Sequence, residues 1–227
     1  MRKIILLAII SLPLLAGFFP QTKTTSVASV SGKDIKLKSS LGRDGMSGIV
    51  VHKYGNDLSS ITTSIIQTNG NRVSILNKDI LSHDELPSVK TNVKVGDKVI
   101  GGYLYNTVMV LAPSEKVYNR ITSSSNKKWV HPDLFAVYLA ENGDSKVTKE
   151  NLYKFSKDYQ IGLIYIVKQN KAILFDPLSQ RVVGSKSISK NPKVGEFPFY
   201  MHFKNLNSGW FSKDSREGNY YREMESI

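Results

Sequence analysis

The stretch of residues 148–183 constrains the fold more than any other part of the sequence. Thr148 can cap a helix with its hydroxyl, and behind it apolar residues recur at helical spacing: Leu152, Phe155 and Tyr159. The β-branched and aromatic run of residues 161–167 then predicts a buried strand. Turns separate it from two more short strands, at residues 172–175 and 181–183. A helix on a three-stranded meander needs additional surface to be stable, so we expect the rest of the chain to cover it.

Residues 29–113, which precede this unit, predict a small all-β domain. Short runs with a period of two are separated by turn signals, of which Asn69-Gly70 is the strongest because both residues tolerate positive φ. The expected strands are residues 34–38, 46–53, 58–67, 72–76 and 95–100, followed by a hairpin over residues 103–111. Such short strands with tight turns predict a small antiparallel β-barrel or sandwich.

Residues 114–211 predict a second domain, in which helices pack on an antiparallel sheet. At Ala112-Pro113 the period of the apolar residues changes from two to about 3.6, the helical value. Ser114 can cap a first short helix, and Pro132 is well placed in the first turn of a second. The predicted fold class is therefore α+β: a small antiparallel β-barrel or sandwich, then a domain of helices and antiparallel sheet.

The end of the chain is aromatic and then polar. Residues 199–206 contain several aromatic side chains and predict an additional strand at a sheet edge. Residues 212–227 are rich in charged side chains, and we expect them to form a mobile C-terminal tail.

The first residues have the pattern of a secretory signal peptide. Two basic residues precede the apolar run Ile4–Phe19, and small polar residues follow. A small-x-small pattern predicts cleavage after Ala28, which would remove residues 1–28; cleavage after Ala16 is the alternative. A retained N-terminal membrane anchor is the competing interpretation, although the run is slightly short for a span. We therefore expect an exported protein, in the periplasm or at the outer cell surface.

The charge balance favours anionic partners. The chain has 31 Lys and Arg against 19 Asp and Glu, a formal net charge of +12, which falls to +9 without the three basic residues of positions 1–28. Such a balance favours binding to an anionic envelope surface or an acidic protein, with plain solubility as the alternative. Export argues against nucleic acid. The absence of cysteine excludes disulfides, thiolate metal sites and a catalytic thiol.

No motif predicts catalysis or a cofactor. The histidines, His52, His83, His131 and His202, are far apart in the sequence, so a zinc site would need distant ligands to converge. The segment Gly45-Met-Ser-Gly48 lacks the spacing of a nucleophile elbow, and no glycine-rich phosphate loop occurs. We therefore predict a protein that is not an enzyme and has no catalytic, cofactor-binding or metal site.

Basic residues next to an aromatic side chain are the candidates for binding. Lys127, Lys128 and Trp129 could stack on a sugar or lie at a membrane interface, whereas the alternative is a solvated loop with one Trp packed in the core. The tail supplies three further cations: Lys213, Arg216 and Arg222.

Five segments, in this order, resemble the N-terminal domain of the plasminogen-binding protein PgbA family. They are residues 95–100 (VGDKVI), 103–106 (YLYN), 110–113 (VLAP), 129–136 (WVHPDLFA) and 161–167 (IGLIYIV). The resemblance covers about residues 50–203 and depends on the order of ordinary structural segments, because none of them carries a catalytic residue. It implies an exported cell-envelope protein whose partner is host plasminogen.

The resemblance also implies a mode of binding. Kringle domains capture a lysine side chain together with a carboxylate, best supplied by a C-terminal lysine. Because this chain ends in Ile227, we expect that mechanism to be absent. An internal mimic would use Lys213, Arg216 or Arg222 beside one of three acidic residues: Asp214, Glu217 and Glu223.

A second likeness concerns architecture alone. Helices followed by a meander resemble domains of periplasmic scaffold proteins in secretion channels and flagellar rings, and a small barrel beside such a domain resembles a flagellar T-type ring component. A periplasmic scaffold subunit of a motility or secretion apparatus, with envelope-complex subunits as partners, is therefore the alternative function.

Overall fold

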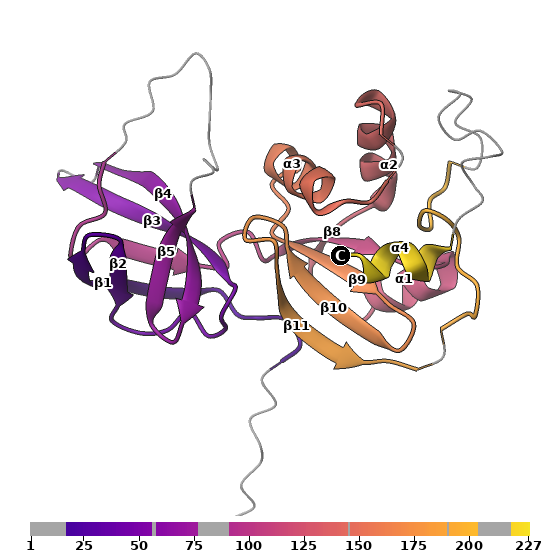
Figure 1. The fold of residues 1–227 in the computed structure, drawn as a ribbon, viewed down its shortest axis with the longest axis horizontal. Coiled ribbons are helices and arrows are strands. Elements are labelled where there is room, and N and C mark those ends of the chain that lie inside the picture. Colours follow the sequence, from indigo (N-terminus) through magenta and orange to yellow (C-terminus); the bar gives the residue numbers. More distant parts are fainter. Residues whose placement is uncertain (1–16, 56–57, 77–90, 145, 190, 204–218) are drawn as a thin grey trace, which may run out of the picture.

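Two sheets lie next to each other, the first built from strands alone and the second covered by helices (Figure 1). The computed structural model describes residues 17–55, 58–76, 91–144, 146–189, 191–203 and 219–227. The mixed α+β class predicted from the sequence is confirmed.

The first sheet is a closed barrel in which every described pairing is antiparallel. Its strands are β1 (Lys23–Ser31), β2 (Asp34–Leu37), β3 (Ser47–Gly55), β4 (Leu58–Asn69), β5 (Arg72–Leu76) and β6 (Lys98–Gly101). The order is β1-β2-β5-β4-β3-β6, and β1 also pairs with β6, so the order closes on itself. Asn69-Gly70 turns the chain from β4 to β5 as expected, with Gly70 at φ 60°.

The second sheet has five strands in the order β11-β10-β9-β7-β8. They are β7 (Thr107–Leu111), β8 (Lys128–Val130), β9 (Leu163–Val167), β10 (Lys171–Asp176) and β11 (Arg181–Ser187). β9, β10 and β11 form the predicted antiparallel meander, but β7 runs parallel to both β8 and β9. The sheet is therefore mixed, and the prediction of a purely antiparallel sheet is wrong.

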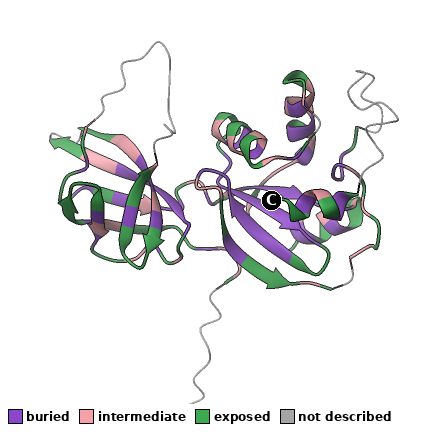
Figure 2. Ribbon diagram, viewed as in Figure 1, coloured by how far each residue is buried: buried purple, intermediate pink, exposed green. Residues whose placement is uncertain are grey.

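Helices cover both faces of this sheet because successive side chains of a strand point to opposite sides. The helices are α1 (Glu115–Thr122), α2 (Pro132–Glu141), α3 (Lys149–Tyr159) and α4 (Tyr220–Glu225). On one face, Tyr165 and its neighbours share a core cluster with α1 and the barrel interior. On the other, Ile164 and Ile166 share a cluster with α2, α3 and α4. Figure 2 shows the resulting buried band through the strands of the sheet.

The predicted helix starts match the structure. Ser114 is the N-cap residue of α1, and Pro132 occupies the first turn of α2. The Thr148 hydroxyl accepts a hydrogen bond from the Asn151 N–H at 3.1 Å, which caps α3.

The hairpin predicted over residues 103–111 is wrong. Residues 102–106 form turns, and β7 then pairs with strands of the second sheet instead of returning to the barrel. The change from one sheet to the other therefore comes after Gly101 and not at Pro113. The chain is tightly packed at this crossing, since a Cβ on Gly162 would lie 2.2 Å from the Leu104 carbonyl.

Two predictions for the C-terminal region are also wrong. Residues 199–203 form no strand in the described part of the chain, and Phe199 is instead buried against the Phe135 ring at 5.7 Å. Residues 204–206 lie outside the described residues. The predicted mobile tail contains α4, whose Tyr220, Tyr221 and Met224 are buried in the core.

Asp176 connects the two sheets. Its carboxylate, fully buried at the end of β10, accepts hydrogen bonds from the Ser47 N–H of β3 at 2.9 Å and from the Tyr105 hydroxyl at 2.6 Å. The backbone N–H groups of Leu178 and Ser179 donate to its second oxygen at 3.0 and 3.1 Å. Burial raises the pKa of Asp176, and the donors act in the opposite direction. The Asp176 carboxylate thus bonds the second sheet to the barrel, in addition to the apolar cluster that the two share and the bond from the Arg43 guanidinium to the Val183 carbonyl oxygen at 2.7 Å.

The first strand of the barrel includes residues on the N-terminal side of the predicted cleavage site after Ala28. β1 starts at Lys23, its residues 23–26 pair with β6, and Val27 is fully buried. Further upstream, the Arg43 guanidinium donates to the carbonyl oxygens of Gly17 and Phe18 at 2.8 and 3.3 Å. Cleavage after Ala28 would remove the residues that close the barrel, so the packing favours the alternative site after Ala16.

We predict that the mature chain begins at Gly17. Mass spectrometry of the protein recovered from its own cells should detect an N-terminal peptide that starts there. As a control, a recombinant chain of residues 29–227 should lack the cooperative unfolding of residues 17–227, because it has lost residues 23–28 of the nine-residue strand β1. A native N-terminus at Ser29 would contradict the prediction.

Candidate functional site

The predicted binding residues Lys127, Lys128 and Trp129 lie at the edge of the second sheet. Lys128 and Trp129 belong to β8, and Lys127 directly precedes it. Lys127 Nζ donates to the Tyr105 carbonyl oxygen at 3.1 Å and lies 5.1 Å from the centre of the Phe19 ring. Burial lowers the pKa of Lys127. Trp129 Nε1–H donates to the Ser125 carbonyl oxygen at 3.2 Å. Two of the three side chains therefore make internal contacts, and Lys128 is the exposed one.

The residues around Lys127 pack Phe18 and Phe19 against the second sheet. The Phe18 ring packs edge-on to Tyr165 at 5.3 Å, and Lys186 Nζ lies 4.5 Å from the centre of the Phe18 ring. Burial raises the pKa of Tyr165 to about 12. Burial, with the neighbouring Arg120 charge as a second cause, lowers the pKa of Lys186. These cations stabilise an internal aromatic layer.

The tail cations are only partly described. Arg222 is exposed on α4, and the next residue, Glu223, accepts the Val147 N–H at 3.3 Å. Lys213 and Arg216 lie outside the described residues, as do Asp214 and Glu217. A binding role for these residues and for residues 127–129 stays a prediction.

α3 presents a lysine next to a carboxylate on a fixed support. Glu150 Oε1 and Lys154 Nζ lie 3.8 Å apart, one helical turn from each other, and their side chains are 55% and 56% exposed. Leu152 and Phe155, on the opposite side of the helix, are fully buried and hold the exposed face in place. The pair has the four-residue spacing that sequence analysis can recognise, so it could have been predicted.

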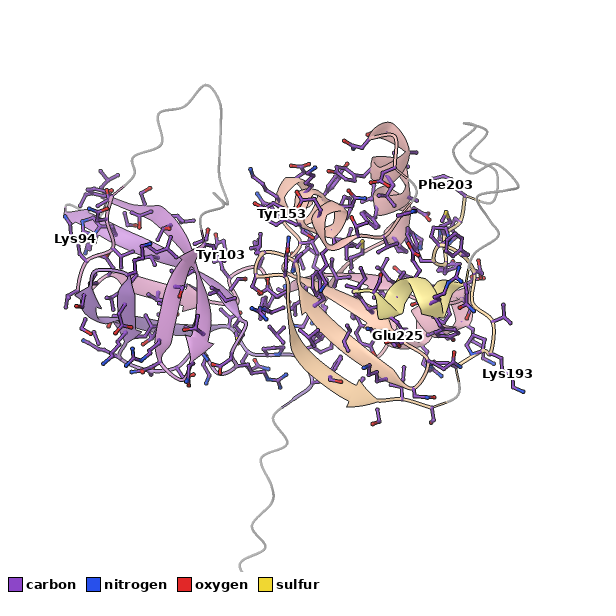
Figure 3. The ribbon with its side chains drawn as sticks, in the orientation of Figure 1. Lys94, Tyr103, Tyr153, Lys193, Phe203 and Glu225 are labelled. Atoms are coloured by element: carbon purple, nitrogen blue, oxygen red, sulfur yellow. The ribbon has the colours of Figure 1, made fainter. Side chains whose placement is uncertain are left out.

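A groove on the barrel combines apolar surface with a basic rim. It has a volume of about 690 Å³ and is lined by residues of β3, β4 and β6 with the preceding turn: Val51, His52, Lys53, Ser59, Val95, Gly96, Asp97, Lys98 and Ile100. His52 Nδ1 lies 2.6 Å from Asp97 Oδ1, and Asp97 Oδ2 accepts the Lys94 N–H at 2.7 Å. Lys94 is labelled at this end of the barrel in Figure 3.

A third group of polar side chains lies at the start of α2. His131 and His202, 71 residues apart, both approach Asp133, and their rings stack at a centroid distance of 4.4 Å. Burial is the main cause that lowers the pKa of His131. Their separation in the sequence left no spacing signal by which they could have been predicted.

In the part of the chain that the structure describes, no helix has the length and apolar character needed to cross a membrane. This concerns the described residues alone, and residues 1–16 are outside them.

Comparison with known proteins gives a consistent result. The family model described as plasminogen-binding protein pgbA N-terminal matches residues 22–226. Two relatives named plasminogen-binding protein PgbA, from Helicobacter pylori strains J99 / ATCC 700824 and ATCC 700392 / 26695, are each 25% identical to the chain, over 157 and 152 residues. The alignments cover 65% and 63% of this chain but 33% and 32% of the relatives.

The chain thus corresponds to about a third of the length of these relatives. No solved structure matches it. The family match extends from the residue before β1 to the last residues of the chain and includes both sheets and all of α4. The chain belongs to the plasminogen-binding protein PgbA N-terminal family.

Proposed function

We propose that this chain is an exported cell-envelope protein that acts by binding a protein partner, with plasminogen as that partner, and that it is not an enzyme. The family match over residues 22–226 is the observation that carries the proposal. The signal-peptide pattern and the formal net charge of +12 support an exported protein with an exposed basic surface.

We further propose that α3 supplies the lysine that plasminogen recognises. The mode of binding implied by the resemblance needs an accessible ammonium group beside a carboxylate. Lys154 and Glu150 provide both on one helical face, and neither contributes to the core. The groove on the barrel offers a second contact area, because a basic rim around apolar surface suits a partner with an acidic face.

Lys149 is the exposed first residue of the same helix. Replacing Lys154 with Ala, together with Lys149, should weaken plasminogen binding about tenfold or more, because truncating a central charged contact removes much of an interface's binding energy. Surface plasmon resonance with the immobilised mature chain measures this. Free lysine should compete with the unmodified chain.

A matched control removes the same charge elsewhere. Lys33, in the turn between β1 and β2, and Lys171, on β10, are exposed, and replacing both with Ala should leave binding within about twofold. The tail is tested in the same way by K213A/R216A/R222A, since deleting it would also remove buried α4 residues. Binding that free lysine does not reduce would contradict the proposal. A strictly periplasmic protein whose deletion impairs motility would favour the scaffold function.

A further inference from the structure

Three side chains from distant parts of the chain converge at the start of α2. His131 caps the helix, Asp133 lies in its first turn, and His202 belongs to the segment that passes beside it; its neighbour Phe203 is labelled in Figure 3. One ligand atom of each residue lies within 4.8 Å of the other two. Two imidazoles and one carboxylate are the donor set that binds divalent transition metals with open positions.

Both imidazoles approach the same carboxylate oxygen. Nδ1 of His202 lies 2.9 Å from Asp133 Oδ2, and Nδ1 of His131 lies 3.1 Å from it. Neighbouring ligands at about 2.1 Å from one ion are about 3.0 Å apart in octahedral geometry and about 3.4 Å apart in tetrahedral geometry. The two separations therefore match those of atoms that share an ion.

The contacts of His131 favour a positive charge between its Nδ1 atom and the Asp133 carboxylate. Its Nδ1 accepts the Asp133 N–H at 3.2 Å, so that it has no proton to offer the carboxylate oxygen 3.1 Å away. Two electron-rich atoms at that distance repel each other. A proton or a metal ion between these two atoms removes the repulsion, although the His131 Nδ1 atom then no longer accepts the Asp133 N–H that caps the helix. A metal ion, unlike a proton, can also bind the Nδ1 atom of His202.

The surroundings suit a cation. The Tyr200 hydroxyl lies 2.9 Å from His202 Nε2, so it can accept the Nε2–H and leave Nδ1 free for a metal, as outer-shell partners of ligating histidines do. The His202 side chain is 61% exposed, so an ion has access.

We propose that His131, Asp133 and His202 bind one divalent transition-metal ion of the zinc or nickel class, which fastens the segment that contains His202 to α2. The ion takes two imidazole nitrogens and one carboxylate oxygen, and its remaining positions hold water or a donor from a partner. This site is independent of the plasminogen proposal, because it uses different residues and its test contains no plasminogen.

Calorimetric titration of the mature, tag-free chain with zinc chloride should give one ion per chain. Zinc at about a hundred times its dissociation constant should raise the midpoint of thermal unfolding by roughly 5 to 10 °C. Magnesium chloride at the same concentration should not, because magnesium prefers oxygen ligands. An equal shift with magnesium would overturn the transition-metal assignment.

Variants separate a built site from general histidine binding. H202A should weaken zinc binding at least a hundredfold while the far-ultraviolet circular dichroism stays unchanged, and Y200F should weaken it about tenfold. H52A is the matched control, since it removes an imidazole that also pairs with a carboxylate, at 2.6 Å, and it should bind zinc like the unmodified chain. H202Q replaces H202A if that variant does not fold. The absence of stoichiometric zinc binding, or equal affinities of the His202 and His52 variants, would overturn the proposal.

Discussion

Replacing Asp176 with Ala should lower the free energy of unfolding by about 3 to 5 kcal/mol, since each buried donor left without an acceptor costs about 1 to 3 kcal/mol. The variant leaves the Ser47 N–H and the Tyr105 hydroxyl without their acceptor inside the core. It also removes the acceptor of the turn after β10, where Leu178 and Ser179 donate. The loss affects both sheets, because Ser47 belongs to the barrel and Asp176 to the second sheet.

Urea denaturation followed by circular dichroism measures this loss. Asp34→Ala is the control, because Asp34 pairs with Arg72 at the surface, where the side chains are 44% and 51% exposed. Its removal should change the free energy of unfolding by about 1 kcal/mol or less. If D176A and D34A lose the same amount, Asp176 does not join the two sheets. A second transition in D176A alone would instead show that the barrel and the sheet have begun to unfold separately.

The local elements of this fold could be predicted from the sequence, and the reason is physical. The helix after Thr148 and the strand of residues 161–167 have patterns that need no distant partner to be recognised. The parallel pairing of β7 with β8 and β9 could not be predicted in this way. β8 is three residues long, and only its place beside β7 makes it a strand.

β1 is not predicted by the sequence either, for a different reason. β1 has the sequence KTTSVASVS, and of its residues only Val27 is buried, so its polar composition gives little period-two signal. The sequence pattern instead predicts a signal peptide over residues 1–28, with cleavage after Ala28. The strand exists because β2 and β6 pair with it on either side, and such pairing is a property of the barrel as a whole.

Among the candidate sites, too, those formed by local spacing can be predicted from the sequence, whereas those formed by distant segments cannot. The Glu150–Lys154 pair follows from helical spacing, so the sequence contains the signal for it. The contacts of Lys127 and Trp129 depend on Phe19 and Tyr105, which only the fold brings close. His131 and His202 meet because the segment after Pro198 passes the start of α2, and sequence spacing contains no information about that approach.

The C-terminal helix supplies the other large expected effect. Replacing Tyr220 with Ala should lower the free energy of unfolding by about 3 to 5 kcal/mol, because it leaves a cavity of aromatic size. Tyr220 is fully buried, and its hydroxyl lies 2.8 Å from the Leu111 carbonyl oxygen and 2.7 Å from that of Val167. These carbonyls belong to the last residues of β7 and β9, so the Tyr220 hydroxyl of α4 contacts the ends of two parallel strands.

Three variants measured by urea denaturation separate the contributions. Tyr220→Phe keeps the ring and removes the hydroxyl, which should cost about 1 to 2 kcal/mol. Arg222→Ala on the exposed side of the same helix should stay within about 0.5 kcal/mol of the unmodified chain. A Y220A chain as stable as the R222A chain would contradict the core role of α4 and support the mobile C-terminal tail predicted from composition. The expected order, with Y220A lowest, would mean that residues 219–227 belong to the core, so that truncations of this region cannot distinguish lost binding from lost folding.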